Sequence, residues 1–185
     1  MVFMVETNDY EIIKNCLNGK TDDFEKLVDR YQKVIFNTVF KIVNDYDDAE
    51  DITQIVFMRA FENLKNFKSE YKFFSWIYRI MMNEAINWKK RGNQFSELDD
   101  NMVSPIKTPE EKYYSDSLSE KIQDSVAELQ IDHRVVIVLK HFVSLPYRDI
   151  SYILDLPEKT VKSRLFTARQ LLSKQLTKNG IKLYD

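Results

Sequence analysis

Hydrophobic side chains recur at helical spacing along most of this chain. Between residues 24 and 43 they return every three or four positions, which predicts one apolar face on a helix of about five turns. A second apolar stripe spans residues 52–64 and follows an acidic segment at 47–50 that resembles a capping box. A third helix is expected from about residue 73 to residue 91, with Gly92 as its end.

Shorter segments complete the pattern of the first half. Residues 9–18 predict a short helix that ends at Asn18-Gly19, and Thr21 is expected to cap the helix after it. Residues 93–115 then show no sustained periodicity, and they contain two prolines and many acidic side chains. This composition predicts an extended linker and not a tight turn.

A second helical unit follows the linker. An apolar stripe at residues 118–129 precedes an expected helix at 133–142, for which Asp132 is the predicted cap. Two more helices are expected at 147–154 and 158–176, joined by a short turn that ends in proline. Two helices joined in this way predict a helix-turn-helix.

The expected fold is therefore all-α. It consists of two small helical domains joined by a flexible linker, and the second domain is a helix-turn-helix. We expect residues 1–92 to form the first domain, residues 93–115 the linker and residues 116–185 the second domain. The chain has 185 residues with only 3 Gly and 4 Pro, which agrees with an almost wholly helical protein.

Several classes of protein are disfavoured by composition. No apolar run approaches the ~18 residues of a spanning helix, so we expect no membrane insertion. The N-terminus lacks the basic leader and cleavage site of a signal peptide. The single cysteine, Cys16, cannot form an internal disulfide, which favours a cytoplasmic location.

Metal and catalytic sites are not expected. The acidic cluster at residues 45–51 lacks the glycine and distal glutamate of a calcium loop, so we interpret it as a solvated helix start. His133 and His141 are eight positions apart on one expected helix, without a zinc pattern. Cys16 has no evident base partner. We therefore predict no catalytic residues, no metal and no cofactor.

Charge is distributed in blocks, although the net charge of the chain is only −2. Residues 59–92 hold eight basic and three acidic side chains, and residues 158–182 hold seven basic and one acidic side chain. Residues 93–132, between these blocks, hold three basic and ten acidic side chains. Two separate basic blocks indicate two separate contacts with an anionic partner such as nucleic acid.

The first basic block is interleaved with aromatic rings. Residues 67–91 contain seven aromatic and six basic side chains. Such a mixture suits unpaired bases, because a base can stack on a ring for about 1–3 kcal/mol while its phosphate meets a cation. Most of these rings are expected in the core, but Phe67, Tyr71 and Phe73 precede the helix and are predicted to contact a ligand.

The second basic block coincides with the predicted helix-turn-helix. Ile150, Leu156, Val161 and Leu165 would pack its two helices together. In such motifs the start of the second helix enters the major groove of duplex DNA. The packing leaves other side chains of that helix for base edges and phosphates, namely Lys159, Thr160, Lys162, Ser163, Arg164, Phe166 and Thr167.

Each half of the chain contains a set of motifs that belong together. The motifs of the first half are Asp48-Ala49-Glu50-Asp51, Gln54, Val56-Phe57, Arg59-Ala60-Phe61 and Phe74-Ser75-Trp76-Ile77-Tyr78-Arg79-Ile80. Those of the second half are Thr160-Val161-Lys162-Ser163-Arg164-Leu165 and Ala168-Arg169. In this order they resemble the extracytoplasmic-function (ECF) group of the sigma-70 family of bacterial RNA polymerase sigma factors. The resemblance covers about residues 20–92, similar to sigma region 2, and 118–176, similar to region 4.

The resemblance implies a role for each region. Asp48, Asp51, Gln54 and Arg59 would bind the β′ clamp helices of the polymerase core, and the second domain would meet the β flap. The set expected at the −10 element, where a base is flipped from the non-template strand, is Phe67, Lys68, Ser69, Glu70, Tyr71, Lys72, Phe73, Arg79, Asn83, Lys89 and Lys90. The set expected at the −35 duplex is Lys159, Thr160, Lys162, Ser163, Arg164, Phe166, Thr167 and Arg169.

The resemblance also implies partners: the polymerase core, promoter DNA and a separate anti-sigma factor. Some positions depart from the family pattern. Ile55 follows Gln54 where an acid is common, Glu158-Lys159 replace a small residue and glycine, and Thr167 replaces a frequent arginine. One other interpretation remains open from the residues alone, a free-standing helix-turn-helix regulator, whereas the lack of expected catalytic residues argues against an enzyme.

Overall fold

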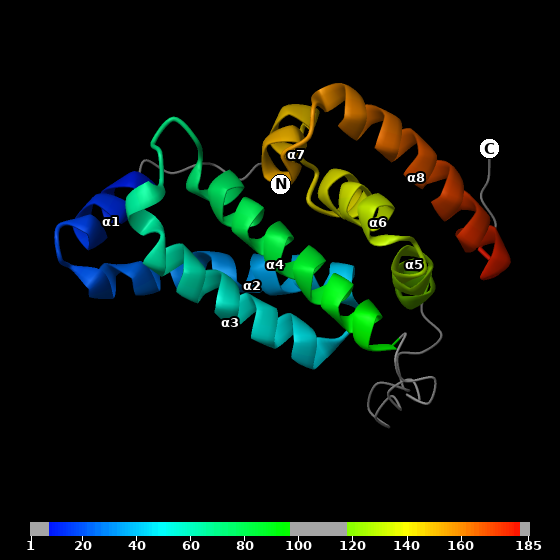
Figure 1. Ribbon diagram of the computed structural model, residues 1–185, viewed down its shortest axis with the longest axis horizontal. Helices are drawn as coiled ribbons and strands as arrows, with labels where there is room; N and C mark the ends of the chain where they lie inside the picture. Colours follow the sequence, from blue (N-terminus) through cyan, green and yellow to red (C-terminus); the bar gives the residue numbers. More distant parts are fainter. Residues whose placement is uncertain (1–7, 97–117, 182–185) are drawn as a thin grey trace.

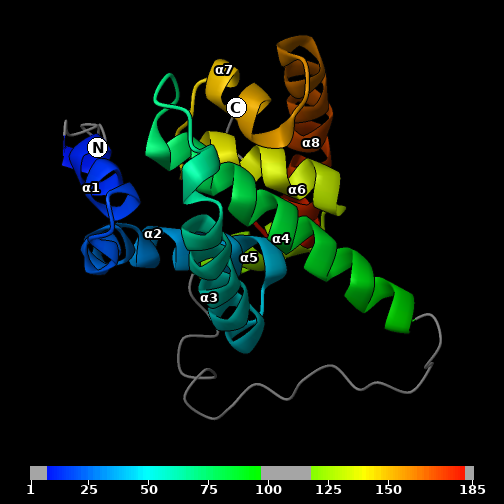
Figure 2. The same ribbon diagram turned by 60° about the vertical axis from the view of Figure 1, so that its left-hand side comes forward.

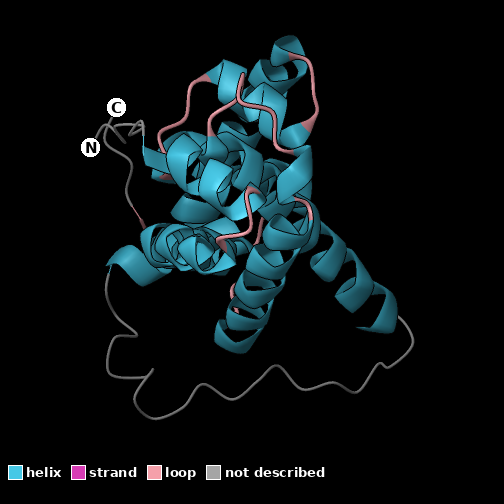
Figure 3. Cartoon of the chain, turned by 90° about the vertical axis from the view of Figure 1, so that its left-hand side faces the viewer, coloured by secondary structure: helices cyan, strands magenta, loops and turns pink. Residues whose placement is uncertain are grey.

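Every regular element of the computed structural model is helical, within the part of the chain that it describes, residues 8–96 and 118–181 (Figure 3). The predicted linker lies almost wholly outside these residues. The first half forms α1 (Asn8–Leu17), η1 (Thr21–Phe24), α2 (Glu25–Val43), α3 (Tyr46–Glu62), η2 (Leu64–Asn66) and α4 (Phe73–Ser96). The second half forms α5 (Leu118–Ala127), α6 (Ile131–Ile137), the π-helical segment η4 (Val138–Phe142), α7 (Tyr147–Leu154) and α8 (Glu158–Lys178). The all-α prediction with two helical domains is confirmed.

The first domain is held together by the apolar faces of α2, α3 and α4. Ile35 and Ile77 are completely buried, as the helical periodicity predicts. One polar pair lies in this core, where the hydroxyls of Thr38 and Tyr78 are 2.9 Å apart. Burial raises the pKa of Tyr78 to about 12, so the phenol stays protonated at physiological pH.

Helix starts differ from the predicted caps at three places. Thr21 begins the short 3-10 helix η1 and makes no side-chain cap bond there. The cap of α3 is Asp45, whose carboxylate accepts a hydrogen bond from the Asp48 backbone N–H at 2.9 Å, so the predicted box at 47–50 lies inside the helix. Gln130 precedes α6, which places Asp132 in the first turn and not at the cap.

Helix α4 continues beyond its predicted end. Gly92 was expected to end it, but the helix runs to Ser96. A glycine inside a helix costs only about 1 kcal/mol relative to alanine, which the rest of the helix can outweigh. Helix α8 likewise extends to Lys178, two residues past its predicted end at 176. Helix α7 spans the predicted residues.

The two domains pack against each other along α4. This helix runs diagonally between the helices of the first half and those of the second (Figure 1), and a turned view also places α6 and α7 beside it (Figure 2). Helix α5 lies next to α2.

The C-terminal end of α2 forms a joint between the domains. Three side chains donate hydrogen bonds to its last carbonyls: Lys89 to Val43 at 3.0 Å, Gln123 to Lys41 at 3.4 Å, and Arg134 to Ile42. Gln123 and Arg134 belong to the second domain. The last carbonyls of a helix lack partners within the helix and carry its negative dipole end, so cationic donors are favoured there.

Arg134 is the buried centre of this joint. Its side chain is 6% exposed and also donates to the carbonyls of Ala127 and Leu129, the latter at 2.9 Å. Burial lowers the pKa of Arg134 from its usual value. Within the described residues, the hydrogen bonds of this guanidinium go to backbone carbonyls, so the side chain ties α2 to the α5–α6 turn by main-chain contacts.

We predict that Arg134→Met lowers the free energy of unfolding by about 2–4 kcal/mol, because three buried carbonyls lose their donor. Urea unfolding followed by circular dichroism measures this change. Arg148→Met is the matched control, since Arg148 lies exposed on α7, and we expect it to change stability by less than about 0.5 kcal/mol. Equal effects of the two substitutions would contradict the role assigned to Arg134.

Candidate nucleic-acid interface

Helices α7 and α8 form the predicted helix-turn-helix. Ile150, Val161 and Leu165 are buried between them, as expected, and Leu156 is half-buried in the turn. Asp155 ends α7 in the left-handed conformation, with φ of 54°. Ser151 fixes the turn twice, because its carbonyl accepts from the Leu156 N–H at 3.1 Å and its hydroxyl donates to the Leu156 carbonyl at 2.5 Å.

The outward face of α8 is open to solvent. Phe166 is 62% exposed, although it is a large apolar side chain. The Lys162 ammonium lies 3.9 Å from the Glu158 carboxylate and over the ring of Tyr147. Both contacts favour this position of the side chain. The predicted −35 residues that are exposed in this structure are Lys159, Lys162, Ser163, Phe166, Thr167 and Arg169.

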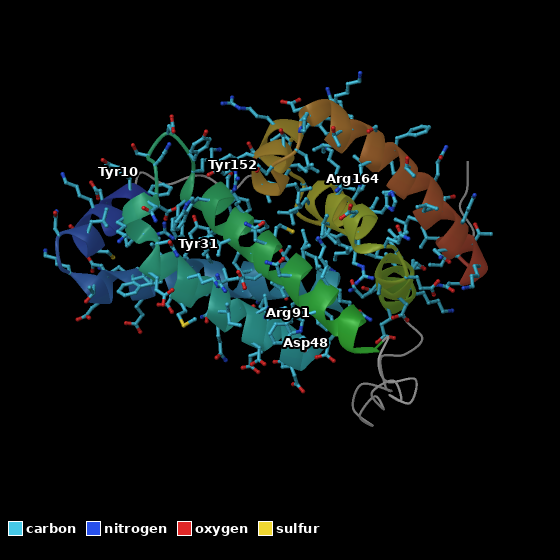
Figure 4. All side chains as sticks on the ribbon, in the orientation of Figure 1. Tyr10, Tyr31, Asp48, Arg91, Tyr152 and Arg164 are labelled. Carbon is cyan, nitrogen blue, oxygen red and sulfur yellow. The ribbon has the colours of Figure 1, made fainter. Side chains whose placement is uncertain are left out.

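Two residues of the predicted −35 set are less accessible. Thr160 is half-buried. Arg164 is half-buried as well, and its guanidinium lies 3.4 Å from the Asp132 carboxylate at the start of α6. Figure 4 shows Arg164 on the inner side of α8, facing the helices of its own domain. Arg164 therefore braces α8 against α6 in this conformation.

The loop between η2 and α4 contains the predicted strand-binding residues. Lys68, Ser69, Glu70, Tyr71 and Lys72 are exposed in it. A turn in which the Tyr71 N–H donates to the Lys68 carbonyl at 3.1 Å shapes the loop.

Phe73 corrects one expectation for this loop. It was predicted to contact a ligand, but it is 2% exposed and packs against Tyr31 with ring centroids 5.5 Å apart. Phe67 is half-buried, and its ring centroid lies 5.9 Å from that of Phe73 and 5.5 Å from that of Trp76. These rings support the base of the loop, which leaves Tyr71 as its exposed ring.

Helix α4 carries the rest of the predicted strand-binding set. Arg79, Asn83 and Lys90 share one side of this helix, because four and seven residues are close to whole turns. Asn83 and Lys90 are exposed. Lys89 does not join them. Its ammonium donates to the Val43 carbonyl, and burial, together with the nearby charge of Arg134, lowers the pKa of Lys89. The expectation that Lys89 faces a DNA backbone is therefore corrected.

Helix α7 of the second domain contacts two residues of the predicted strand-binding set, Tyr71 and Arg79. The rings of Tyr71 and Tyr152 stack, with centroids 4.2 Å apart and planes 17° apart. Arg79 donates to the Tyr152 carbonyl at 3.2 Å and pairs with the Asp155 carboxylate at 3.2 Å. In Figure 4 Tyr152 points from α7 toward the first domain. A ring pair of this kind contributes about 0.5–1.5 kcal/mol and an exposed ion pair about 0–1 kcal/mol.

Helix α3 presents a mixed polar and apolar stripe. Asp51 and Gln54 are exposed, as predicted for polymerase-binding residues. Met58 and Phe61 continue the same side of the helix and are 55% and 44% exposed. Arg59 lies on the flank toward α4, where it pairs with the buried Glu84 at 3.2 Å.

The four residues predicted on α3 to bind polymerase therefore do not share one exposed surface. Asp48 is half-buried near the start of the helix (Figure 4), and Arg59 is directed toward α4. The helical spacing of Ile52, Val56 and Ala60 already indicated that Met58 and Phe61 lie off the buried face, although they were not selected as site residues. No sequence pattern pointed to Tyr152 or Asp155, because their partners lie in the other domain.

Among the described residues, no group of three or more His, Cys, Asp and Glu side chains lies close enough to hold a metal ion. No helix in the same part of the chain has both the length and the apolar composition needed to cross a membrane.

The fold and these surfaces define a class: two packed helical domains, one a helix-turn-helix with an open basic face. Comparison with known families agrees with it. The family described as Sigma-70 region 2 matches residues 27–94, and the family described as Sigma-70, region 4, matches residues 119–172.

Curated relatives match over nearly the whole chain. The ECF RNA polymerase sigma factor SigW of Bacillus subtilis is 33% identical, over 89% of this chain and 94% of that protein. The RNA polymerase sigma-H factor of Pseudomonas aeruginosa is 29% identical, over 94% of this chain and 96% of that protein. Among solved structures, the sigma factor RpoE in complex with the anti-sigma factor NepR from Bartonella quintana has a TM-score of 0.68 at 24% identity. That match covers 84% of this chain and 97% of the other and supports the shared fold.

The chain therefore belongs to the sigma-70 family of RNA polymerase sigma factors, in its ECF group. Membership supports a promoter-directing subunit of RNA polymerase over a free-standing regulator.

We predict that Phe73→Ala and Tyr71→Ala differ sharply in stability. Phe73→Ala should lower the free energy of unfolding by about 3–5 kcal/mol, because it leaves a cavity in the core. Tyr71→Ala should cost about 1 kcal/mol or less, since it removes one surface ring contact. Urea unfolding of both variants checks this. Similar losses for the two would contradict the assignment of Phe73 to the core and Tyr71 to the surface.

Proposed function

We propose that the two domains of this sigma factor divide promoter recognition. The first domain would hold a single strand of the −10 element through its loop and α4. The second would bind the −35 element as duplex through α8. The observation that carries the proposal is the exposed, basic outward face of α8 in a helix-turn-helix, with a second cationic and aromatic surface on the other domain.

The α8 face suits duplex DNA for chemical reasons. Lys159, Lys162 and Arg169 offer positive charge to phosphates or guanine edges, and Ser163 offers a hydroxyl for several groups. Phe166 adds an exposed apolar surface, which suits a thymine methyl group. Arg164 would act mainly by bracing α8 against Asp132.

The first-domain surface suits an unpaired strand. Tyr71 is an exposed ring on which a base can stack, and Lys68 and Lys72 flank it in the loop. Arg79, Asn83 and Lys90 extend this surface along α4, with charge for phosphates and an amide for a base edge. Ser69 and Glu70 complete the exposed loop. Phe67 and Phe73 would support it from below.

The partners proposed for other surfaces follow from the same assignment. The exposed stripe of Asp51, Gln54, Met58 and Phe61 on α3 would contact the β′ clamp helices of the polymerase core, with acidic and apolar groups in one patch. The second domain would meet the β flap. We propose that an anti-sigma factor restrains this chain, that it acts in the cytoplasm, and that polymerase and not this chain performs the chemistry.

Reconstituted transcription tests the proposed function. Purified chain is added to RNA polymerase core on fragmented genomic DNA of the host, and transcript 5′ ends are mapped by sequencing. We expect new start sites that depend on the chain and share sequence elements about 10 and 35 base pairs upstream, about two and a half helical turns apart. Starts that are the same with core alone would contradict the proposal.

We predict that Lys162→Ala weakens binding to such a −35 duplex and lowers the slope of log K against log salt by about 1, because one phosphate contact is lost. Fluorescence anisotropy across a salt series measures both effects, and the probe is the upstream element from the transcript map. Lys174→Ala, an exposed change near the far end of α8, is the control and should leave the slope unchanged. Equal slopes for wild type and Lys162→Ala would rule out that phosphate contact.

A further inference from the structure

Asp9 is a buried acidic residue of α1 that takes no part in the interface described above. It lies in the first turn of that helix and is 4% exposed. An ionised carboxylate is costly to remove from water, and pairing it with a cation often only offsets that cost. Helix α1 also lies before the residues that match Sigma-70 region 2. Stability alone therefore does not explain a carboxylate at this position.

Two side chains of α2 contact the Asp9 carboxylate, one at each oxygen. The Arg30 guanidinium pairs with Oδ1, and the Tyr31 hydroxyl donates to Oδ2 at 2.5 Å. Burial, followed by the hydrogen bond to Asp9, raises the pKa of Tyr31 above its usual value, so the hydroxyl remains a donor at physiological pH. Arg30 lies at the surface, whereas Tyr31 is 7% exposed. The carboxylate thus has one bond toward the surface and one toward the core.

The bond toward the core leads to the base of the loop at residues 68–72. The Tyr31 ring packs on Phe73, the first residue of α4, with centroids 5.5 Å apart. The Phe73 ring centroid lies 5.9 Å from that of Phe67 and 5.6 Å from that of Trp76. In Figure 4 Tyr31 lies below the loop, near the start of α4. The Asp9 carboxylate therefore connects α1 to the cluster of rings beneath the loop.

Both ends of the loop belong to that cluster. Phe67 follows η2 directly and Phe73 begins α4, so the loop runs from one clustered ring to another. Helix α1 also contacts η2, on the side from which the chain enters the loop. A rotation of the Tyr31 ring displaces Phe73, because tightly packed side chains transmit strain. The orientation of one buried ring thus affects the shape of the exposed loop.

We propose that Asp9 is a positioning residue for strand recognition, which holds the ring cluster beneath the loop through the Tyr31 hydroxyl. The inference rests on the proposed function of that loop. Asp9 touches no DNA in this role and acts through Tyr31. A hydrogen bond restricts the orientation of a ring more narrowly than apolar contact does, since it requires a defined distance and angle. Helix α1 is therefore part of strand recognition, although none of its residues was predicted to bind DNA.

The test separates the two bonds of the Asp9 carboxylate in the full chain. Tyr31→Phe removes the hydroxyl bond and keeps the ring, and Asp9→Leu removes both bonds with an apolar side chain of similar size. Arg30→Met is the first control, because it removes the ion pair and leaves the hydroxyl bond. Thr38→Val is the second control, since it removes the buried hydrogen bond between Thr38 and Tyr78 elsewhere in the same domain.

The first measurement uses neither DNA nor polymerase. The chain has two tryptophans, so Trp88→Phe leaves Trp76, which lies beside Phe67 and Phe73. Acrylamide quenching of Trp76 fluorescence, measured where every variant is folded, reports how tightly the ring cluster is closed. We expect stronger quenching in the two variants that lose the hydroxyl bond, and the value of the Trp88→Phe parent in both controls.

The second measurement is strand binding by holoenzyme assembled from polymerase core and each variant. The probe is the fluorescein-labelled non-template strand of the −10 element from the transcript map, and fluorescence anisotropy gives its Kd. We expect Tyr31→Phe to bind about two- to tenfold more weakly, the scale of one hydrogen bond. Its preference over strands with a single replaced −10 base should also fall. A change of stability alone leaves this preference intact in folded molecules.

Tyr31→Phe decides the outcome by itself if Asp9→Leu fails to fold. Stronger quenching with weaker and less selective strand binding, absent from both controls, supports the positioning role. Unchanged quenching, unchanged strand binding, or equal effects in Arg30→Met or Thr38→Val overturns it. Failure of the wild-type holoenzyme to bind the strand bears on the proposed function alone, because the quenching measurement contains neither polymerase nor DNA.

Discussion

The arrangement of the two domains depends on the last carbonyls of α2, which have no partner within the helix itself. A helix that ends inside a protein must find donors for its last carbonyls, and here the donors are Lys89, Gln123 and Arg134. Two of the three come from the second domain. The end of α2 therefore helps to position the second domain, together with the contacts that α7 makes with Tyr71 and Arg79.

The helical architecture was readable from the sequence because it follows from local periodicity. The stripes in α2, α3 and α4 became the first core, and the two helices of the helix-turn-helix appeared at their expected positions. Helix ends were less accurate. Asp45 and not the 47–50 box caps α3, and Gly92 does not stop α4, because a single cap or glycine contributes about 1 kcal/mol that neighbouring packing can override.

The residues of the candidate site could be predicted only in part, because some of their contacts come from elements that are distant in the sequence. Exposed residues of α8 and of the 68–72 loop were named correctly as accessible, since polar runs beside apolar stripes face solvent. Phe73 and Lys89 were not, because ring burial against Tyr31 and a bond to the end of α2 depend on other elements. Tyr152 was missed because only tertiary structure places it on Tyr71.

The position of Asp155 has a consequence for how the two halves communicate. This residue ends α7 and so sets the direction from which α8 departs, and its carboxylate also holds Arg79 of the other domain. A tilt of the helix-turn-helix therefore changes the contact with Arg79 on α4, and thermodynamic linkage makes the influence equal in both directions. Ionic strength tunes this coupling, because mobile ions screen an exposed pair far more than the buried Arg134 joint.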